Sequence, residues 1–531
     1  MLSMVQEIIV LRAAQLYIVV LVFITVCYAV SCFFSYFRPH LRQLPGPFLA
    51  RFTRLYKVYI SLKGDSHIEY QKLHDKYGPI IRTGPNAVSI GDAAMIPEVY
   101  LQGSLYQKSS YITGFTFTID GQSMENIFTS RDAAQHKIMR SSVASKYSLS
   151  SMLQLEPLFD KCIPLFVAHM DKRAGTAVDF GEWLSWFSFD LTGLLSFQEM
   201  FGFMDQARDI NGAIGAGWAT MTYGAIVGQF PAAHKYLFGN PTLVGMIDRI
   251  WEKNPINMIQ QTAYAAMKKY DLEKPTNVRG DLLEYLRQKQ LKDSTIMDER
   301  EIMNNILIFF IGAVDTNSTA LRAIFYYVVK TPRTYAALVK ELQDADSTGL
   351  LSEVLSFQEG QKLPYLQACI KEAMRMHPTV GSPFDRVVPK GGVVLNGQFI
   401  PEGTDIGITG WVTQRDKGVF GDDADFFRPE RWIEVDEMQV RRMDKNMLAF
   451  GLGNRSCIGK HVAMMVLTKT VGQIVRNFDM EWASEKEEWD TTCRMQVRQT
   501  GVVMRLTRRG IRGCNGGDTK GYIEVRQIGE G

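Results

Sequence analysis

The sequence predicts a mainly α-helical protein with a smaller β region, preceded by a single N-terminal transmembrane helix. Three observations support this fold class. Residues 13–37 are mostly apolar, residues 301–330 form a long apolar helical run, and residues 80–90 have the pattern of a short hairpin. The chain has 531 residues, 46% of them hydrophobic, so it can bury a large core.

Composition limits the classes of function. The formal net charge is +3, which gives no reason to expect a nucleic-acid partner. The seven cysteines are scattered, without a C-x-x-C pair or the spacing of a zinc site. We therefore expect a reducing compartment and no disulfide framework.

Residues 13–37 carry no charged side chain. About 20 apolar residues span the hydrocarbon core of a bilayer, so the stretch is long enough for a membrane anchor. The alternative is a cleaved signal peptide. That alternative fits less well because a signal core has only ~7–15 apolar residues, and no convincing small-residue cleavage site follows.

Charges around this stretch predict its orientation. Two charged residues precede it and three basic residues follow it: Glu7 and Arg12, then Arg38, His40 and Arg42. Basic residues favour the cytoplasmic side, so residues 1–12 should be lumenal and the long C-terminal part cytosolic.

The remaining chain divides into three parts. Residues 38–50 contain Leu44-Pro-Gly-Pro47, which cannot continue a helix and predicts a hinge. Residues 51–509 form the predicted body. Residues 510–531 are glycine-rich and polar, which predicts a loose tail.

Two local elements of the body can be placed. Residues 80–82 and 87–90 should pair as a hairpin around Gly84-Pro85-Asn86. Residues 130–140 should open a helix, with Ser130 as its N-cap.

Cys457 is the candidate centre of the site. It lies in a loop punctuated by glycine, Phe450-Gly-Leu-Gly-Asn-Arg-Ser-Cys-Ile-Gly459, just before an apolar run that can form a helix. A thiolate ligand needs nearby N–H donors and positive potential, and the start of a helix supplies both. Arg455 could pair with a carboxylate of a cofactor. The loop glycines leave room for a flat cofactor: Gly451, Gly453 and Gly459.

Three other interpretations of this loop exist. A phosphate-binding loop fails because Asn454 replaces its first glycine and His461 replaces its Ser or Thr. A dinucleotide fingerprint fails because Ser456 stands at its third glycine. An inert buried thiol is the ordinary state of a lone cysteine.

The pattern Phe-x-x-Gly-x-Arg-x-Cys-x-Gly resembles the haem-ligand signature of the cytochrome P-450 family. The sequence matches it at every fixed position: Phe450, Gly453, Arg455, Cys457 and Gly459. The resemblance extends over about residues 51–509. It implies the cytochrome P-450 fold and haem b, iron protoporphyrin IX, with the Cys457 thiolate as axial ligand to the metal.

Asp315 and Thr316 interrupt the apolar run of residues 301–330. Burying them is costly unless they are hydrogen-bonded. A simple helix kink, with Thr316 bonded to the preceding turn, is one explanation. The resemblance implies another, an acid–threonine pair that relays protons to iron-bound dioxygen. Ala313 and Asn317 depart from the family pattern, which usually has glycine and threonine there.

Glu372 and Arg375 are three residues apart on a predicted helix and would ordinarily form a weak surface pair. The resemblance instead implies a buried network, completed by Arg431, that supports the haem loop. His136, Arg140 and Arg386 could be solvated surface charges. The resemblance implies that they approach the haem propionates.

The predicted substrate pocket draws on an aromatic loop near residue 115, the apolar run before residue 312, the irregular segment 379–384 and the hairpin strand 497–503. Its predicted members are Phe115, Phe310, Ala313, Val380, Phe384 and Thr500.

The resemblance implies a membrane-bound monooxygenase of the endoplasmic reticulum. It would oxidise a hydrophobic small molecule by hydroxylation, oxidative demethylation or several successive steps, using O2. Because the sequence has no flavin or nicotinamide motif, electrons should come from an NADPH–cytochrome reductase on the same membrane, with cytochrome b5 as an additional donor. Residues 384–432 and 497–501 are similar to fungal pisatin demethylase-like members, which act in secondary metabolism.

Two alternatives remain open. A haem–thiolate isomerase or dehydratase would need no reductase, but it typically lacks the acid–threonine pair. A membrane haem carrier or sensor without enzymatic activity would need neither that pair nor an aromatic pocket.

Overall fold

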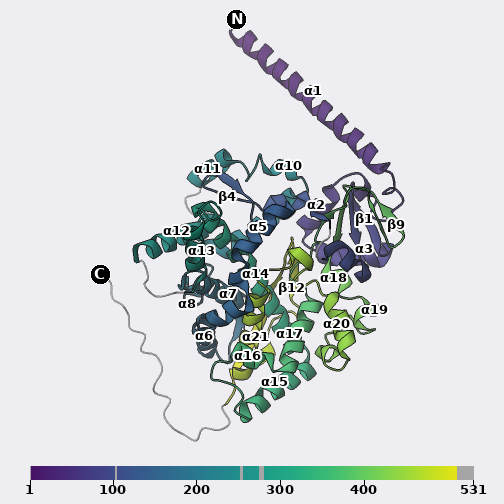
Figure 1. The fold of residues 1–531 in the computed structure, drawn as a ribbon. Helices are drawn as coiled ribbons and strands as arrows, with labels where there is room; N and C mark the ends of the chain where they lie inside the picture. Colours follow the sequence, from purple (N-terminus) through teal and green to yellow (C-terminus); the bar gives the residue numbers. More distant parts are fainter. Residues whose placement is uncertain (1, 102–104, 251–254, 274–279, 511–531) are drawn as a thin grey trace.

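The computed structural model describes residues 2–101, 105–250, 255–273 and 280–510. Most of these residues are helical (Figure 1). The helices are α1 (Leu2–Tyr36), α2 (Leu55–Lys63), α3 (Ser66–Tyr77), α4 (Ile96–Tyr100), α5 (Ala133–Val143), α6 (Leu149–Asp171), α7 (Phe180–Phe197), α8 (Phe203–Gln206), α9 (Ala213–Val227), α10 (Pro231–His234), α11 (Pro241–Ile250), α12 (Pro255–Glu273), α13 (Leu282–Lys292), α14 (Glu299–Lys330), α15 (Pro332–Ser347), α16 (Phe357–Gln361), α17 (Pro364–Met376), α18 (Gly410–Thr413), α19 (Lys417–Phe420), α20 (Glu437–Lys445) and α21 (Lys460–Asn477).

The strands are short. They are β1 (Ile80–Gly84), β2 (Ala87–Ile90), β3 (Gln107–Lys108), β4 (Phe117–Ile119), β5 (Gln122–Met124), β6 (Ala177–Asp179), β7 (Arg386–Val387), β8 (Val393–Leu395), β9 (Gln398–Ile400), β10 (Asp405–Ile408), β11 (Phe478–Trp482), β12 (Asp490–Cys493), β13 (Val497–Thr500) and β14 (Val503–Arg508). The mainly α class with a smaller β region is thus confirmed.

Helix α14 runs through the main core. Asp298 caps its start by accepting a hydrogen bond from the Glu301 amide at 2.8 Å. Pro332 follows its end, where a proline cannot extend the helix. Most of its side chains are buried against α7, α17 and α21. The predicted helix at residues 301–330 is confirmed to within two residues.

The predicted hairpin is also confirmed. Strands β1 and β2 pair antiparallel, and β2 pairs in parallel with β10. The full sheet has the order β1-β2-β10-β7-β3. Its side chains form a second core cluster on the side of the body nearest α1 (Figure 1).

The N-cap of α5 differs from the prediction. Asp132 is the cap, and its carboxylate accepts from the Gln135 amide at 2.7 Å. Ser130 is fully buried two residues earlier, and its carbonyl accepts a hydrogen bond from Arg455. Ser130 therefore serves a tertiary contact rather than the helix end.

Helix α1 projects away from the body (Figure 1). Its segment Gln15–Tyr36 has 22 residues, a mean hydropathy of 2.5 and no buried residue, so it is long and apolar enough to cross a membrane. Helix α14 also passes this test of composition, but 67% of its apolar window is buried in the body. Helix α14 is therefore a core helix, and α1 is the candidate anchor.

The joint between α1 and the body is built around Arg82, which is fully buried. Its guanidinium donates to the Ser35 carbonyl at 2.5 Å and the Tyr36 carbonyl at 3.5 Å, at the end of α1. It also donates to the Pro85 carbonyl at 2.8 Å. The last carbonyls of a helix have no partner within the helix, so Arg82 satisfies them from the body.

The predicted hinge at residues 38–50 is consequently a packed joint. Leu41 and Leu44 are buried in the second core cluster. A side chain on Gly46, which has φ +150°, would lie 2.3 Å from the Arg82 carbonyl oxygen. The predicted loose tail lies outside the described residues, apart from Gly510.

We expect Arg82→Met to loosen this joint, because unpaired buried carbonyls cost about 1–3 kcal/mol. Trypsin should then cleave after Arg38, Arg42 and Arg51 about tenfold faster, as measured by timed digestion and mass spectrometry. Arg441→Met is the control, because that side chain is exposed on α20. An unchanged cleavage rate in Arg82→Met would show that this arginine does not hold the joint.

Candidate active site

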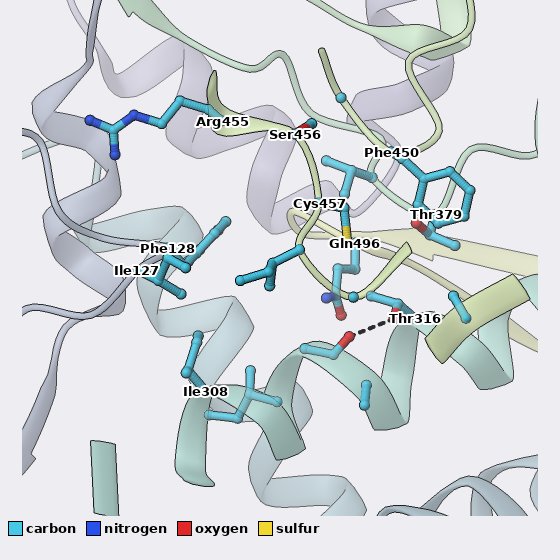
Figure 2. Close-up of a pocket in the computed structure, with 18 of the residues that line it drawn as sticks. Ile127, Phe128, Ile308, Thr316, Thr379, Phe450, Arg455, Ser456, Cys457 and Gln496 are labelled. Carbon is cyan, nitrogen blue, oxygen red and sulfur yellow. Dashed lines mark hydrogen bonds between the residues drawn. The ribbon is translucent and has the colours of Figure 1, made fainter. Parts of the chain in front are cut away.

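A cavity of about 310 Å³ lies between α14, α5 and the loop that precedes α21. Its walls are mainly aliphatic and aromatic, and none of the described residues that line it is acidic. Figure 2 shows Cys457 pointing across this cavity toward the part of α14 that carries Thr316. A largely apolar cavity with a few polar groups is typical of a site for a cofactor or a small molecule.

The Cys457 loop is closed by a hydrogen bond from the Cys457 amide to the Phe450 carbonyl, at 2.7 Å. Cys457 is exposed, and it lines the cavity together with Phe450, Gly451 and Gly459. Burial of the loop raises the pKa of the Cys457 thiol, whereas the Gly459 amide and the charges of Arg140 and Lys460 oppose that rise. The loop thus supplies the N–H donor and positive charges that a thiolate requires.

Gly453 does not contribute to the cavity wall, contrary to the prediction. It has φ +69°, a backbone conformation that favours glycine. The glycine therefore shapes the loop and does not make room for a cofactor.

Five basic side chains line the cavity. They are Lys108, His136, Arg140, Arg386 and Arg455. Burial and the neighbouring cations lower the pKa of His136 to about 3 and that of Arg455 to about 10. Because none of the described residues that line this cavity is acidic, an anionic ligand would strongly stabilise these five basic side chains.

All three arginines of this group bind the backbone, and Arg386 donates to the Asp385 carbonyl at 3.2 Å. Arg140 donates to the Ser456 carbonyl at 2.8 Å, next to the cysteine. Arg455 donates to the Ser130 carbonyl at 2.8 Å and extends away from Cys457 (Figure 2). Arg140 and Arg455 join α5 to the cysteine loop, and their charges remain at the cavity.

On α14, Ala313, Thr316 and Asn317 line the cavity, but Asp315 does not. The Thr316 hydroxyl donates to the Gly312 carbonyl at 2.5 Å, as in the predicted helix-kink alternative. A side chain on Gly217 of α9 would lie 3.6 Å from an Asp315 carboxylate oxygen, so this carboxylate faces α9. Burial raises the pKa of Asp315, while Arg322 and Arg498 oppose the rise.

These features fit haem. The cavity offers an apolar volume, a cysteine sulfur on one wall and a cationic rim that suits the two haem carboxylates. The comparison with protein families agrees, since the cytochrome P-450 model matches residues 44–507.

This chain belongs to the cytochrome P-450 family. Two similar proteins are the cytochrome P-450 monooxygenase cicH of Emericella nidulans, 33% identical over 91% of this chain and 97% of the relative, and pisatin demethylase of Fusarium vanettenii, 33% identical over 90% of each. The cytochrome P-450 monooxygenase gsfF of Penicillium aethiopicum is 34% identical over 89% of this chain and 94% of the relative.

Membership confirms the predicted family and the predicted class of enzyme. The protein is a cytochrome P-450 monooxygenase, an oxidoreductase that incorporates oxygen and uses a cysteine-ligated haem. Enzymes of this family use a redox partner, a substrate and O2.

The Glu372–Arg375 pair of this cytochrome P-450 is fully buried and is not a surface pair. Glu372 accepts hydrogen bonds from Arg375 and Arg431 at 2.8 Å, and from the Trp432 indole at 2.9 Å. Arg375 also donates to the Gln414 carbonyl at 2.7 Å. The carboxylate thus fixes α17 against the segment that contains Arg431.

Gln414 connects this network to the cysteine loop. Its amide group donates to the Met374 and Arg375 carbonyls, and its side-chain oxygen accepts from the Leu448 amide at 2.7 Å. Leu448 lines the cavity two residues before Phe450. No local pattern predicts this link, because an isolated glutamine carries no motif.

Two predicted pocket residues lie elsewhere. Phe310 is buried against the aromatic rings of Phe197 and Phe201, with ring centroids 5.9 and 5.4 Å away. Thr500 is exposed and pairs with Asp490 in the β12–β13 ladder. The turn at the other end of that hairpin reaches the cavity instead, through Met495 and Gln496.

The other predicted pocket residues line the cavity: Phe115, Ala313, Val380 and Phe384. Residues that the sequence analysis missed include Lys108, Phe128, Ile308, Met495 and Gln496. Spacing could have indicated Ile308, which lies four and eight residues before Gly312 and Thr316 on one helix face.

We expect Glu372→Ala to lower the free energy of unfolding by about 3–5 kcal/mol, because it leaves two buried guanidinium groups without their carboxylate. Thermal unfolding and haem content of the purified protein measure the effect. Glu437→Ala is the control, since Glu437 forms an exposed pair with Arg441.

The milder Gln414→Leu should fold but lose haem more readily, because it leaves Glu372 and its guanidinium partners in place and removes the side-chain bonds to Leu448, Met374 and Arg375. Normal haem retention in Gln414→Leu would contradict the proposed support of the loop.

Proposed function

We propose that this protein is a membrane-anchored haem–thiolate monooxygenase that oxidises a hydrophobic small molecule, with Cys457 as the iron ligand. The observation that carries the proposal is the cysteine sulfur facing an apolar cavity with a basic rim and no acidic residue among its described lining. Haem b, when bound with a thiolate ligand, supplies the activation of O2 for insertion into a C–H bond.

Burial raises the pKa of the Cys457 thiol, so ionisation of the sulfur depends on the groups around it. The Gly459 amide and the charges of Arg140 and Lys460 favour the ionised sulfur. Arg386 and Lys108 offer positive charge, and His136 offers a hydrogen bond, to the two carboxylates of the cofactor. His136 is neutral at physiological pH because its pKa is lowered to about 3.

Asp315 and Thr316 handle protons. Thr316 presents a hydroxyl at the cavity wall, and its bond to the Gly312 carbonyl fixes the oxygen. Asp315 lies on the adjoining side of α14, half-buried and influenced by Arg322 and Arg498. Because its pKa is raised, the Asp315 carboxyl holds a proton more readily than an exposed aspartate, so it can resupply the threonine hydroxyl.

The walls select the substrate. Phe115, Val380 and Phe384 face an apolar space that excludes water, and the exposed part of Ala313 leaves room above Cys457. The similarity to pisatin demethylase supports a role in fungal secondary metabolism, with hydroxylation or oxidative demethylation as the reaction.

The anchor and the partners follow from the same proposal. Helix α1 spans the endoplasmic reticulum membrane once, with its N-terminus lumenal and the body cytosolic, since basic residues follow the span. An NADPH–cytochrome reductase on that membrane supplies electrons, and cytochrome b5 is a second donor.

Cys457→Ser should abolish the strongly red-shifted Soret band of the reduced carbon monoxide complex, because a serine oxygen does not donate charge to iron as a thiolate does. Absorption spectra of the reduced protein with carbon monoxide test this. Cys27→Ser, in α1, is the matched control and should keep the band. Retention of the band in Cys457→Ser would make the ligand assignment wrong.

Thr316→Ala should increase the fraction of NADPH electrons released as hydrogen peroxide, because the cavity wall loses its hydroxyl. A positioned proton donor typically contributes 10²–10⁴-fold, so coupling should fall by on the order of tenfold or more, with water replacing part of the function. Peroxide release per NADPH consumed, with a reductase present, measures the change. Thr348→Ala, exposed on the distant end of α15, should behave as wild type. Unchanged coupling in Thr316→Ala would exclude the proton role.

A further inference from the structure

A second cavity, of about 330 Å³, adjoins the first. It lies between the β4–β5 hairpin, α5, the segment 295–298 and the first turns of α14. Ile127 and Asn305 belong to the walls of both cavities. These two side chains therefore form a partition between the site above Cys457 and a neighbouring space.

Amide and carboxylate groups line the second cavity together with methionine and isoleucine side chains. Asn126 and Asn304 are 2% and 1% exposed, and within the described part of the chain the Asn126 Nδ2 and Asn304 Oδ1 atoms have no hydrogen-bond partner. A buried polar group without a partner costs about 1–3 kcal/mol. Water or a ligand group inside the cavity would remove that cost.

The Asn126 side-chain oxygen and the Asn304 side-chain nitrogen form hydrogen bonds to the backbone of the cavity wall. The Asn126 side-chain oxygen accepts from the Phe128 and Thr129 amides, at 2.9 and 3.0 Å. The Asn304 amide group donates to the Glu125 carbonyl at 2.8 Å. The segment that carries Ile127 is thus fixed to α14, and the unused polar atoms belong to a defined wall.

Helix α14 connects the two spaces. Asn305, Ile308, Gly312 and Thr316 recur every three or four residues, so they share the face of α14 that lines the first cavity. Figure 2 shows Ile127 and Ile308 on the same side of that cavity. Asn305 precedes Ala313 by eight residues, which corresponds to about 12 Å along the helix axis.

We propose that the substrate is elongated and occupies both cavities, with its apolar, reacting part above Cys457 and a neutral hydrogen-bonding end, such as an amide or hydroxyl, beside Asn305. The inference rests on the proposed monooxygenase function. The Ile127 side chain must turn aside to join the two spaces.

Charges in the second cavity favour a neutral end over an anionic one. Asp298 and Glu301 line it, and burial raises the pKa of Glu301. Arg300 also lines it, but its guanidinium donates to the Gln122 side chain. A carboxylate on the substrate would therefore meet two acidic side chains and a cation that is already bonded.

Three probes of equal chain length test the inference on the full-length protein with haem: dodecanamide, dodecanoate and dodecyl chloride. Their dissociation constants are measured from the shift of the haem Soret band and, independently, by calorimetry. Dodecanamide should bind about tenfold more tightly than dodecyl chloride, since one or two hydrogen bonds in a buried site give a difference of this order. Dodecanoate should bind more weakly than dodecanamide.

Variants locate the polar end. Asn305→Leu should remove the preference for dodecanamide and leave dodecyl chloride unaffected, whereas Asn305→Gln should retain it. Met139→Trp fills the second cavity alone, because Met139 does not line the first. It should weaken dodecanamide about tenfold without affecting the short probe hexanamide. Asn446→Leu, at the end of α20, is the matched control.

Equal affinities of the wild type for dodecanamide and dodecyl chloride would overturn the inference, with the second cavity then holding water only. So would a preference that survives both Asn305→Leu and Met139→Trp. The carbon monoxide spectrum tests the monooxygenase assignment separately. If the red-shifted Soret band were absent from the wild type, calorimetry would still measure whether the second cavity binds a neutral end.

Discussion

One fully buried carboxylate, Glu372, joins α17 to the segment that contains Arg431 and, through Arg375 and Gln414, to the cysteine loop. Two guanidinium groups, an indole N–H and the Arg428 amide all bind it, so its charge is compensated in every direction. A buried ion pair of this kind adds little net stability but is strongly destabilising when one partner is removed. Its value is geometric. Through Gln414 it fixes Leu448, and the loop from Leu448 to Cys457 then has one position relative to α14.

The basic side chains that line the cavity repel one another. Lys108 is half-buried beside Arg386 and Arg455, and desolvation together with their charges lowers its pKa well below the usual value. The rim side chains therefore repel one another until anionic groups lie among them. Binding of the two haem carboxylates would relieve that repulsion, which links cofactor binding to the stability of the fold. The same positive potential favours a thiolate at Cys457. One set of basic side chains would therefore stabilise both the haem carboxylates and the ionised sulfur.

Much of the fold and the identity of the central residues could be predicted from sequence, because both rest on local patterns. The β1–β2 hairpin follows from its turn residues, and Cys457 from fixed spacing. The direction in which each side chain of a helix faces was harder to predict. Phe310 and Ala313 are three residues apart on α14, yet Phe310 packs against Phe197 at the end of α7 and does not line the cavity. Lys108 and Gln414 act through contacts with distant segments, which no local pattern encodes. The packed joint at Arg82 likewise depends on the carbonyls of Ser35 and Pro85, and Ser35 is distant from Arg82 in the sequence.

Helix α14 fixes the distance between two parts of the site. Thr316 and Asn305 lie on one helix that is buried along most of its length, so the distance between these two residues cannot change by loop movement. A substrate held beside Asn305 would present the same carbon above Cys457 in each binding event. The choice of carbon would then depend on chain length measured from the polar end, and the apolar walls would contribute affinity without setting that position.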